Sequence, residues 1–175
     1  MNLTAALCMA VASLGVSKSA RNTACNHMGY IVEQSKKNNV EPSLIVSMMY
    51  VESGFQKKVV SKAGACGLMQ LIPKWNYLVV NGKKRYYTCE LLKRDTRLNI
   101  KLGVLALKKW MKIVKADDPE NLKSDILNRS ICAYNAGNRC RWKKRIKNPA
   151  KTKYAKRVLA TQEKIHKALR VVHKK

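Results

Sequence analysis

Acidic residues are scarce in this sequence: ten Asp and Glu stand against 36 Lys and Arg, which gives a formal charge of +26. That excess is larger than a fold requires and indicates a polyanionic partner or surface. Nucleic acid, teichoic acid, lipopolysaccharide and anionic peptidoglycan all have the required charge. Aromatic residues make up only 6% of the chain and no recognised nucleic-acid module is present, so base stacking on single strands is poorly supported.

Long apolar runs are also missing. No run reaches the roughly 20 residues of an ordinary spanning helix, so we expect a soluble mature protein. Residues 1–20 hold an apolar stretch that ends in small residues, and they resemble a secretory signal cleaved after Ala20, although Lys and Arg are absent before the stretch. A buried N-terminal helix is the alternative. Residues 21–175 are expected to form one domain.

The six cysteines and three histidines follow no metal-binding pattern. Their spacing fits neither a zinc ribbon nor a CxxC redox motif, so we expect no metal and no cofactor. Disulfides are possible, but the spacing leaves their pairing open. Removal of a leader that contains Cys8 would leave an odd number of cysteines, one of them free or paired between chains.

Apolar residues recur mainly at helical spacing, which predicts a mainly α protein. The expected helices cover residues 22–38, 42–53, 98–115, 120–136 and a basic C-terminal helix at 150–171. Pro42 and Pro119 fit first turns, while Gly54 and Gly137 fit helix ends. Between residues 77 and 88 the sequence YLVVNGKKRYYT predicts a small β-hairpin, because an Asn-Gly pair lies between β-branched and aromatic residues.

One carboxylate lies on an apolar helix face. Leu44, Ile45, Met48 and Met49 form a stripe that reaches Glu52 one turn later, just before the expected helix end. Apolar surroundings and the negative end of the helix dipole both favour a protonated acid, which can donate a proton to a leaving oxygen. A structural glutamate that caps a loop amide or pairs with Lys is the alternative interpretation.

Three blocks of sequence then follow in order: ESGF at residues 52–55, SKAGACGLMQLIP at residues 61–73 and AYNAG at residues 133–137. They resemble the motifs of the soluble lytic transglycosylases (SLT), whose fold is related to goose-type lysozyme. Two weaker echoes are Asn99-Ile100 with Gly103, and Thr152, Tyr154 and Val158. The resemblance covers about residues 28–160 and implies a lysozyme-like single domain with a small β-hairpin.

The resemblance implies that Glu52 is the catalytic residue of a site that binds peptidoglycan glycan strands. The substrate-binding residues that it implies are Ser61, Gly67, Met69, Gln70, Tyr134 and Asn135. Glycines at 64 and 67 allow close backbone approach to a sugar, the Gln70 amide suits sugar hydroxyl and acetamido groups, and Met69 offers a soft apolar surface. Tyr134 is expected to reach toward the carboxylate or the substrate acetamido group.

The implied reaction is cleavage of the bond between N-acetylmuramic acid and N-acetylglucosamine with formation of a 1,6-anhydro sugar. No Asp or Glu lies between Phe55 and Cys89, so the second carboxylate that most glycosidases use is not evident. A goose-type muramidase, in which water attacks, is the nearest alternative. A non-catalytic basic protein that binds envelope polymers is the second.

The expected partners are glycan strands in the cleft and anionic envelope polymers on the basic surface, with no nucleic acid, and the expected state is a monomer. The resemblance implies action outside the cytoplasm, in the periplasm or after secretion. A phage lysis enzyme, a virion-associated enzyme and a secretion or conjugation factor all fit, and no residue distinguishes them.

Overall fold

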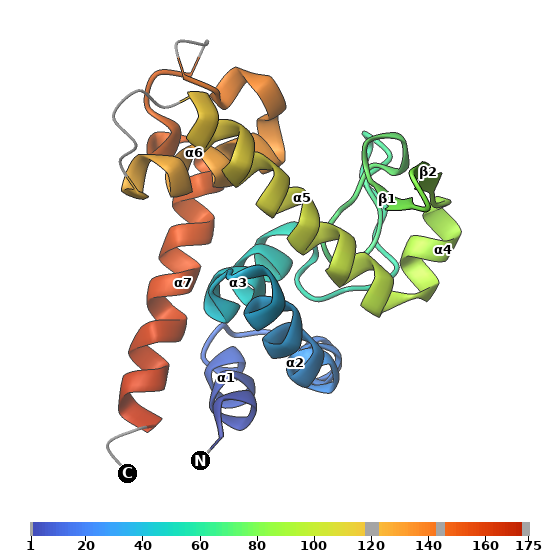
Figure 1. The fold of residues 1–175 in the computed structure, drawn as a ribbon. Helices are drawn as coiled ribbons and strands as arrows, with labels where there is room; N and C mark the ends of the chain where they lie inside the picture. Colours follow the sequence, from blue (N-terminus) through green and yellow to red (C-terminus); the bar gives the residue numbers. More distant parts are fainter. Residues whose placement is uncertain (1, 118–122, 143–145, 173–175) are drawn as a thin grey trace.

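The computed structural model describes residues 2–117, 123–142 and 146–172. Within these ranges the chain forms seven α-helices and one two-stranded hairpin (Figure 1). The helices are α1 (Leu3–Ala12), α2 (Lys18–Asn38), α3 (Pro42–Ser53), α4 (Cys89–Arg94), α5 (Thr96–Asp117), α6 (Lys123–Ala136) and α7 (Lys153–Val172). The strands are β1 (Tyr77–Val80) and β2 (Lys83–Tyr86), and short 3-10 turns are η1 (Pro73–Trp75), η2 (Gly137–Cys140) and η3 (Pro149–Lys151).

The mainly α prediction is confirmed, and the reasons for the helix boundaries are visible. Pro42 opens α3 at its first turn, and Gly54 ends it in the left-handed conformation at φ 58°. Gly137 follows the last residue of α6, also at positive φ. Pro119 and the first residues of the helix expected from residue 120 lie outside the described residues. No helix in the described part of the chain is both long and apolar enough to cross a membrane.

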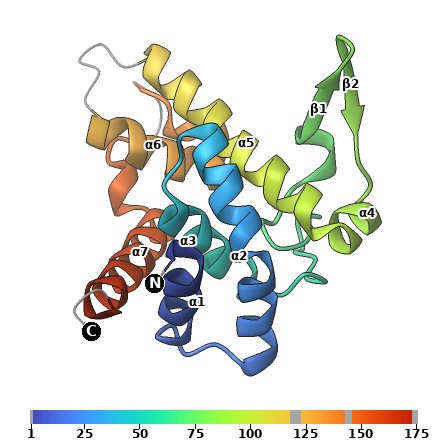
Figure 2. The same ribbon diagram turned by 60° about the horizontal axis from the view of Figure 1, so that its bottom comes forward.

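Helix α3 is the centre of the fold. Leu44, Ile45, Met48 and Met49 are all at most 2% exposed, and α7 and α2 pack against this helix. Helix α7 extends from the α6 region to the C-terminus beside α3 and α1, whereas α5 crosses from the α4 side to α6 (Figures 1 and 2). Most of the buried apolar residues form one continuous core, and a small second cluster lies around the disulfide between α6 and η2.

The predicted hairpin is confirmed. Its strands pair antiparallel with Tyr77 opposite Tyr86 and Val80 opposite Lys83. Asn81 and Gly82 form the turn, both with positive φ, as a tight two-residue connection requires. The hairpin projects from the helical body beside α5 (Figure 2), and β2 is exposed along its whole length.

Three disulfides, whose pairing the sequence left open, connect neighbouring elements. Cys8–Cys25 joins α1 to α2, Cys66–Cys89 joins the loop after α3 to α4, and Cys132–Cys140 joins α6 to η2. Among the described residues no cysteine is free. Two of the three bridges therefore fix the segments that carry the second and third sequence blocks.

The apolar N-terminal stretch folds as α1. Ala6, Leu7, Ala10 and Val11 are buried, and the helix packs against α2 and α7. The leader at residues 1–20 stays a prediction. Its cleavage after Ala20 would remove α1 and deprive Cys25 of its disulfide partner.

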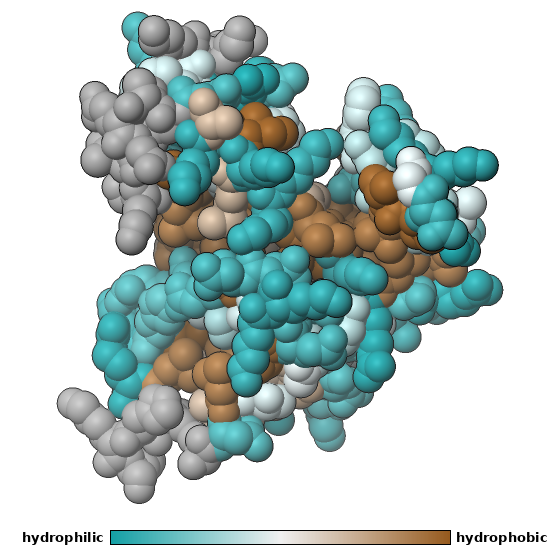
Figure 3. Space-filling view, in the orientation of Figure 1, coloured by the Kyte–Doolittle hydropathy of each residue, from teal (hydrophilic) through white to brown (hydrophobic). Residues whose placement is uncertain are grey.

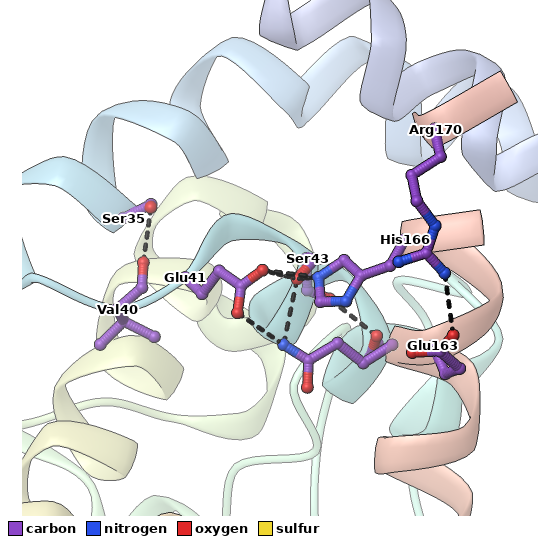
Figure 4. A network of polar contacts seen from close by, with 9 residues as sticks. Ser35, Val40, Glu41, Ser43, Glu163, His166 and Arg170 are labelled. Carbon is purple, nitrogen blue, oxygen red and sulfur yellow. Dashed lines mark hydrogen bonds and ion pairs between the residues drawn. The ribbon is translucent and has the colours of Figure 1, made fainter. Parts of the chain in front are cut away.

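A polar network fastens α7 to the start of α3 (Figure 4). His166 Nε2 lies 2.6 Å from Glu41 Oε1 and 2.9 Å from Ser43 Oγ. The Gln162 amide donates to Glu41 Oε2 at 2.9 Å and to Ser43 Oγ at 3.1 Å. These contacts fix the position of α7 along α3, on which the site described below depends.

A single buried amide connects α5 to the loop that follows α3. Asn99 is 0% exposed; its Nδ2 donates to the carbonyls of Cys66 and Leu92, and its Oδ1 accepts from the Met69 amide at 2.8 Å. Close packing accompanies these bonds, since a Cβ added at Gly103 would lie 2.7 Å from the Met69 side chain. The weak motif match at Asn99 and Gly103 therefore corresponds to the residues that attach α5 to the loop after α3.

We predict that Asn99→Ala lowers the free energy of unfolding by about 2–4 kcal/mol, because it leaves the buried Met69 N–H without an acceptor. Urea denaturation followed by circular dichroism measures the change. Lys112→Ala, on an exposed position of the same helix, is the control and should change the value by less than about 0.5 kcal/mol. An equal effect of both substitutions would contradict the role of Asn99.

Candidate active site

Glu52 lies where the sequence predicts, in the last turn of α3 at the edge of the core. Its side chain lines a cleft of about 770 Å³. Phe55, which follows the helix end, is 1% exposed and closes the core beneath this turn. Ser53 donates from its hydroxyl to the Leu68 carbonyl at 2.9 Å, so the end of α3 is tied directly to the loop of the second sequence block.

The surroundings keep the Glu52 carboxyl protonatable near neutral pH. Burial raises its pKa from the ordinary 4.5 to about 7, while a hydrogen bond from Tyr154 and the positive charge of Arg157 act in the opposite direction. A carboxyl with such a pKa is present in both protonation states at pH 7. It can therefore serve as an acid and, after losing its proton, as a base.

Tyr154 is the residue that holds the carboxyl, and sequence reasoning did not assign it to the site. Its hydroxyl donates to Glu52 Oε1 at 2.6 Å across 102 residues of sequence. Burial, with the nearby Glu52 charge, raises the pKa of Tyr154 well above 10, so the phenol stays a donor. Its place in the weak motif match formed by Thr152, Tyr154 and Val158, at the start of α7, could have identified it.

Tyr134 was expected to reach toward Glu52 or the substrate acetamido group; the structure shows no hydrogen bond from it to Glu52, and its contact with substrate stays a prediction. Its hydroxyl donates instead to the Met69 carbonyl at 2.8 Å, so it braces the loop. The ring still lines the cleft, and burial together with the charge of Glu52 raises the pKa of this phenol as well. The hydrogen bond to Glu52 comes from Tyr154, whereas the Tyr134 hydroxyl has its partner in the loop.

The cleft lies between the α6 side of the molecule and the hairpin, with α5 as one wall. Figure 3 shows this face hollowed between the two lobes, with hydrophobic side chains gathered in the hollow. The wall comes from residues spaced along one side of α5: Leu102, Leu105, Ala106, Lys109, Trp110 and Ile113. The rest of the cleft lining comes from the second and third sequence blocks and from the residues that lead into β1.

Four of the six substrate-binding candidates, Ser61, Gln70, Tyr134 and Asn135, line this cleft. The Ser61 hydroxyl accepts from the Ala65 amide at 3.1 Å. The Gln70 amide group donates to the carbonyls of Val59 and Gly67, which holds Gln70 in a positive-φ conformation. Both side chains therefore shape their own loop as well as border the cleft.

Gly67 and Met69 do not line the cleft, which corrects their expected role. Met69 is 0% exposed because its side chain packs against Gly103. At Gly67 an added Cβ would lie 2.4 Å from Asn99 Nδ2 and 2.9 Å from the Leu92 carbonyl. The glycine therefore permits close approach of α5 and α4, and its φ of 75° reinforces the requirement.

The cleft also contains residues that sequence reasoning did not single out, among them Trp75, Asn76, Tyr77, Lys109 and Trp110. The spacing of the α5 residues in the sequence could have predicted that they share one helix face. It could not have predicted that this face borders the cleft. Of the carboxylates in the described residues, only Glu52 lines the cleft. No group of three or more His, Cys, Asp and Glu in that part of the chain could hold a metal ion.

A half-buried carboxyl at a helix end, facing a cleft in a mainly helical body with one hairpin, is typical of a lysozyme-like domain. A solved structure, an inactive mutant of lytic transglycosylase Slt from Pseudomonas aeruginosa, shares this fold with a TM-score of 0.57. The match has 23% sequence identity and covers 82% of this chain and 24% of that one.

The family model described as "Transglycosylase SLT domain" matches residues 29–157, and the chain belongs to this family. Membrane-bound lytic murein transglycosylase C from three strains of Actinobacillus pleuropneumoniae is 41% identical over 51 residues. That stretch is 29% of this chain and only 14% of each of those proteins.

We predict that Tyr154→Phe raises the pKa of Glu52 above its value of about 7, because the lost hydrogen bond favours the ionised form. Carboxyl-carbon NMR titration of glutamate-labelled protein measures the shift. Tyr134→Phe is the matched control, since its hydroxyl bonds a carbonyl and not the acid. If Tyr134→Phe moved the titration more than Tyr154→Phe, the assignment of the two phenols would be wrong.

We also predict that Glu52→Gln stabilises the fold in a pH-dependent way. Below pH 4.5 both folded and unfolded states hold the proton; between pH 4.5 and about 7 only the folded state does, so stability falls as pH rises. The cost of burying the carboxylate at higher pH is at most about 3 kcal/mol. Denaturation at pH 4 and pH 8.5 should show a gain for Glu52→Gln only at pH 8.5.

Glu90→Gln is the control for this pH dependence, because the Glu90 side chain is 83% exposed and pairs only with Lys93. It should show no gain in stability at pH 8.5, because it removes only an exposed ion pair. A pH-independent effect of Glu52→Gln would show that the Glu52 carboxyl does not titrate near pH 7.

Proposed function

We propose that this protein is a peptidoglycan lytic transglycosylase that cleaves the β-1,4 bond between N-acetylmuramic acid and N-acetylglucosamine with formation of 1,6-anhydromuramic acid. One observation carries the proposal: the half-buried carboxyl of Glu52, with a pKa of about 7, is the only carboxyl of the described residues that borders the cleft, and it is held by a phenol. Family membership supports the reaction class, and residues from each of the three sequence blocks line part of the cleft.

In the proposed mechanism Glu52 first donates its proton to the glycosidic oxygen, and the bond from that oxygen to the muramyl anomeric carbon breaks. The substrate's own acetamido group stabilises the cationic centre that develops. Glu52, now a carboxylate, accepts the proton of the muramyl 6-hydroxyl as that oxygen bonds to the anomeric carbon. The carboxyl is restored, and neither water nor a cofactor is consumed.

The alternative on the same substrate is a muramidase, in which water attacks the anomeric carbon. That route usually needs a second carboxylate as base or nucleophile. In the described part of the cleft Glu52 has no acidic neighbour to take this role. The intramolecular hydroxyl needs no separate base, because the carboxylate that Glu52 becomes already faces the reacting centre.

A non-catalytic polymer-binding protein is the other alternative. It would account for the charge of +26, but it gives no reason to bury a carboxyl at a cleft, which costs stability at neutral pH. We assign the charge instead to attraction toward anionic envelope polymers, an effect that salt weakens. The active form is proposed to be a monomer.

Three disulfides support action outside the cytoplasm, in the periplasm or after secretion, because such bonds persist in oxidising compartments. The leader at residues 1–20 fits the same location. The mass of the exported protein tests it: cleavage after Ala20 gives a chain with Cys25 unpaired, and retention of α1 gives three intact disulfides.

We predict that incubation with purified peptidoglycan releases soluble fragments that end in 1,6-anhydromuramic acid, as mass spectrometry identifies them. Glu52→Gln should abolish release, by at least about a hundredfold, while binding to the insoluble wall is retained. Fragments with reducing ends would identify a muramidase. Binding without any product from the unaltered protein would favour the non-catalytic alternative.

A further inference from the structure

The hairpin and the segment that leads into it carry positive charge without any acidic residue. Residues 73–88 include Lys74, Lys83, Lys84 and Arg85, and no Asp or Glu. Strand β2, with three of these cations, is exposed, and Trp75 in η1 is 65% exposed. The proposed reaction uses none of these side chains.

Two cations from different elements meet at one aromatic ring. Lys84 Nζ of β2 lies 5.0 Å from the centre of the Tyr77 ring, and Lys109 Nζ of α5 lies 5.6 Å from it. In the described residues neither lysine forms an ion pair with a carboxylate. The face of a tyrosine attracts ammonium groups only weakly at exposed positions, so two like charges are gathered with little compensation.

This cluster belongs to the cleft. Tyr77 and Lys109 both line it, and Trp110, the next residue of α5, lines it as well. An anion bound between the two lysines would lie at the edge of the cleft, because Lys109 lines the cleft while Lys84 belongs to the exposed strand β2. A charged group carried by a substrate in the cleft could reach this position.

The glycan strand offers such a group. Its sugars are uncharged, but the lactyl ether of each muramyl residue carries a peptide stem with free carboxylates. We propose that Lys84 and Lys109, placed around Tyr77, bind the carboxylates of a peptide stem on the strand that lies in the cleft. This assignment rests on the proposed function, since it takes peptidoglycan as the substrate.

Neither lysine takes part in the proposed proton transfers, so we expect its contacts with a stem to be the same before and during the reaction. Such uniform binding lowers KM and leaves kcat nearly unchanged. The pair therefore determines substrate specificity: the enzyme prefers strands with peptide stems over strands from which the stems have been removed.

The test compares the double variant Lys84→Gln/Lys109→Gln with the unaltered protein on two substrates. They are a tetrasaccharide of alternating N-acetylglucosamine and N-acetylmuramic acid with tetrapeptide stems, and the same tetrasaccharide without stems. The readout is the ratio of kcat/KM on the two substrates. We expect the double variant to reduce this preference roughly tenfold to a hundredfold, through KM on the substrate with stems.

The matched control is Lys164→Gln/Lys167→Gln, which removes the same charge from exposed positions of α7. It should keep the preference of the unaltered protein. An equal loss in both double variants would show that overall charge, not the pair, sets the preference. An unchanged preference in Lys84→Gln/Lys109→Gln, or an equal loss on both substrates, would overturn the proposal.

A binding measurement separates this proposal from the proposed reaction. Isothermal titration of the Glu52→Gln protein with each tetrasaccharide needs no cleavage. Tighter binding of the substrate with stems, lost on adding Lys84→Gln and Lys109→Gln, supports the stem site even if the unaltered protein cleaves neither substrate. Equal affinity for both tetrasaccharides rejects the site even if cleavage occurs.

Discussion

The burial of one carboxyl group determines how the rest of the molecule is arranged. Glu52 lies at the end of a helix whose other face is core, so its carboxyl is removed from water while one edge opens to the cleft. Burial alone disfavours the ionised form, and the Tyr154 bond and Arg157 partly restore it. The opposition of these effects yields a group that gives and takes a proton near neutral pH, at the expense of stability there.

Long-range contacts are needed to hold this balance. Tyr154 is 102 residues from Glu52, so its position depends on how α7 lies along α3. The network of Glu41, Ser43, Gln162 and His166 fixes that position some way from the acid. On the other side, Ser53 and Asn99 tie the loop of the second sequence block to α3 and α5. The position of the Glu52 carboxyl therefore depends mainly on contacts between helices and loops, and less on hydrogen bonds of the carboxyl itself.

Much of this could be predicted from sequence, because periodicity reports which face of a helix is buried. The stripe from Leu44 placed Glu52 correctly, and Asn81-Gly82 placed the hairpin turn. Periodicity does not report which residue of another helix meets that face. For this reason Tyr154 was not assigned to the site, Met69 was expected at the cleft although it packs on Gly103, and the disulfide pairs were left open.

The charge of +26 and the protonatable acid impose opposite demands. A cation in contact with Glu52 would be worth about 4 kcal/mol at an effective dielectric constant of 20, enough to ionise the carboxyl fully at pH 7. Among the described residues Arg157 is the one cation that lowers this pKa, and it does so less than burial raises it. Lys109 and the lysines of the hairpin are not among the groups that shift this pKa, so in the proposed function they can attract an anionic strand without ionising the acid.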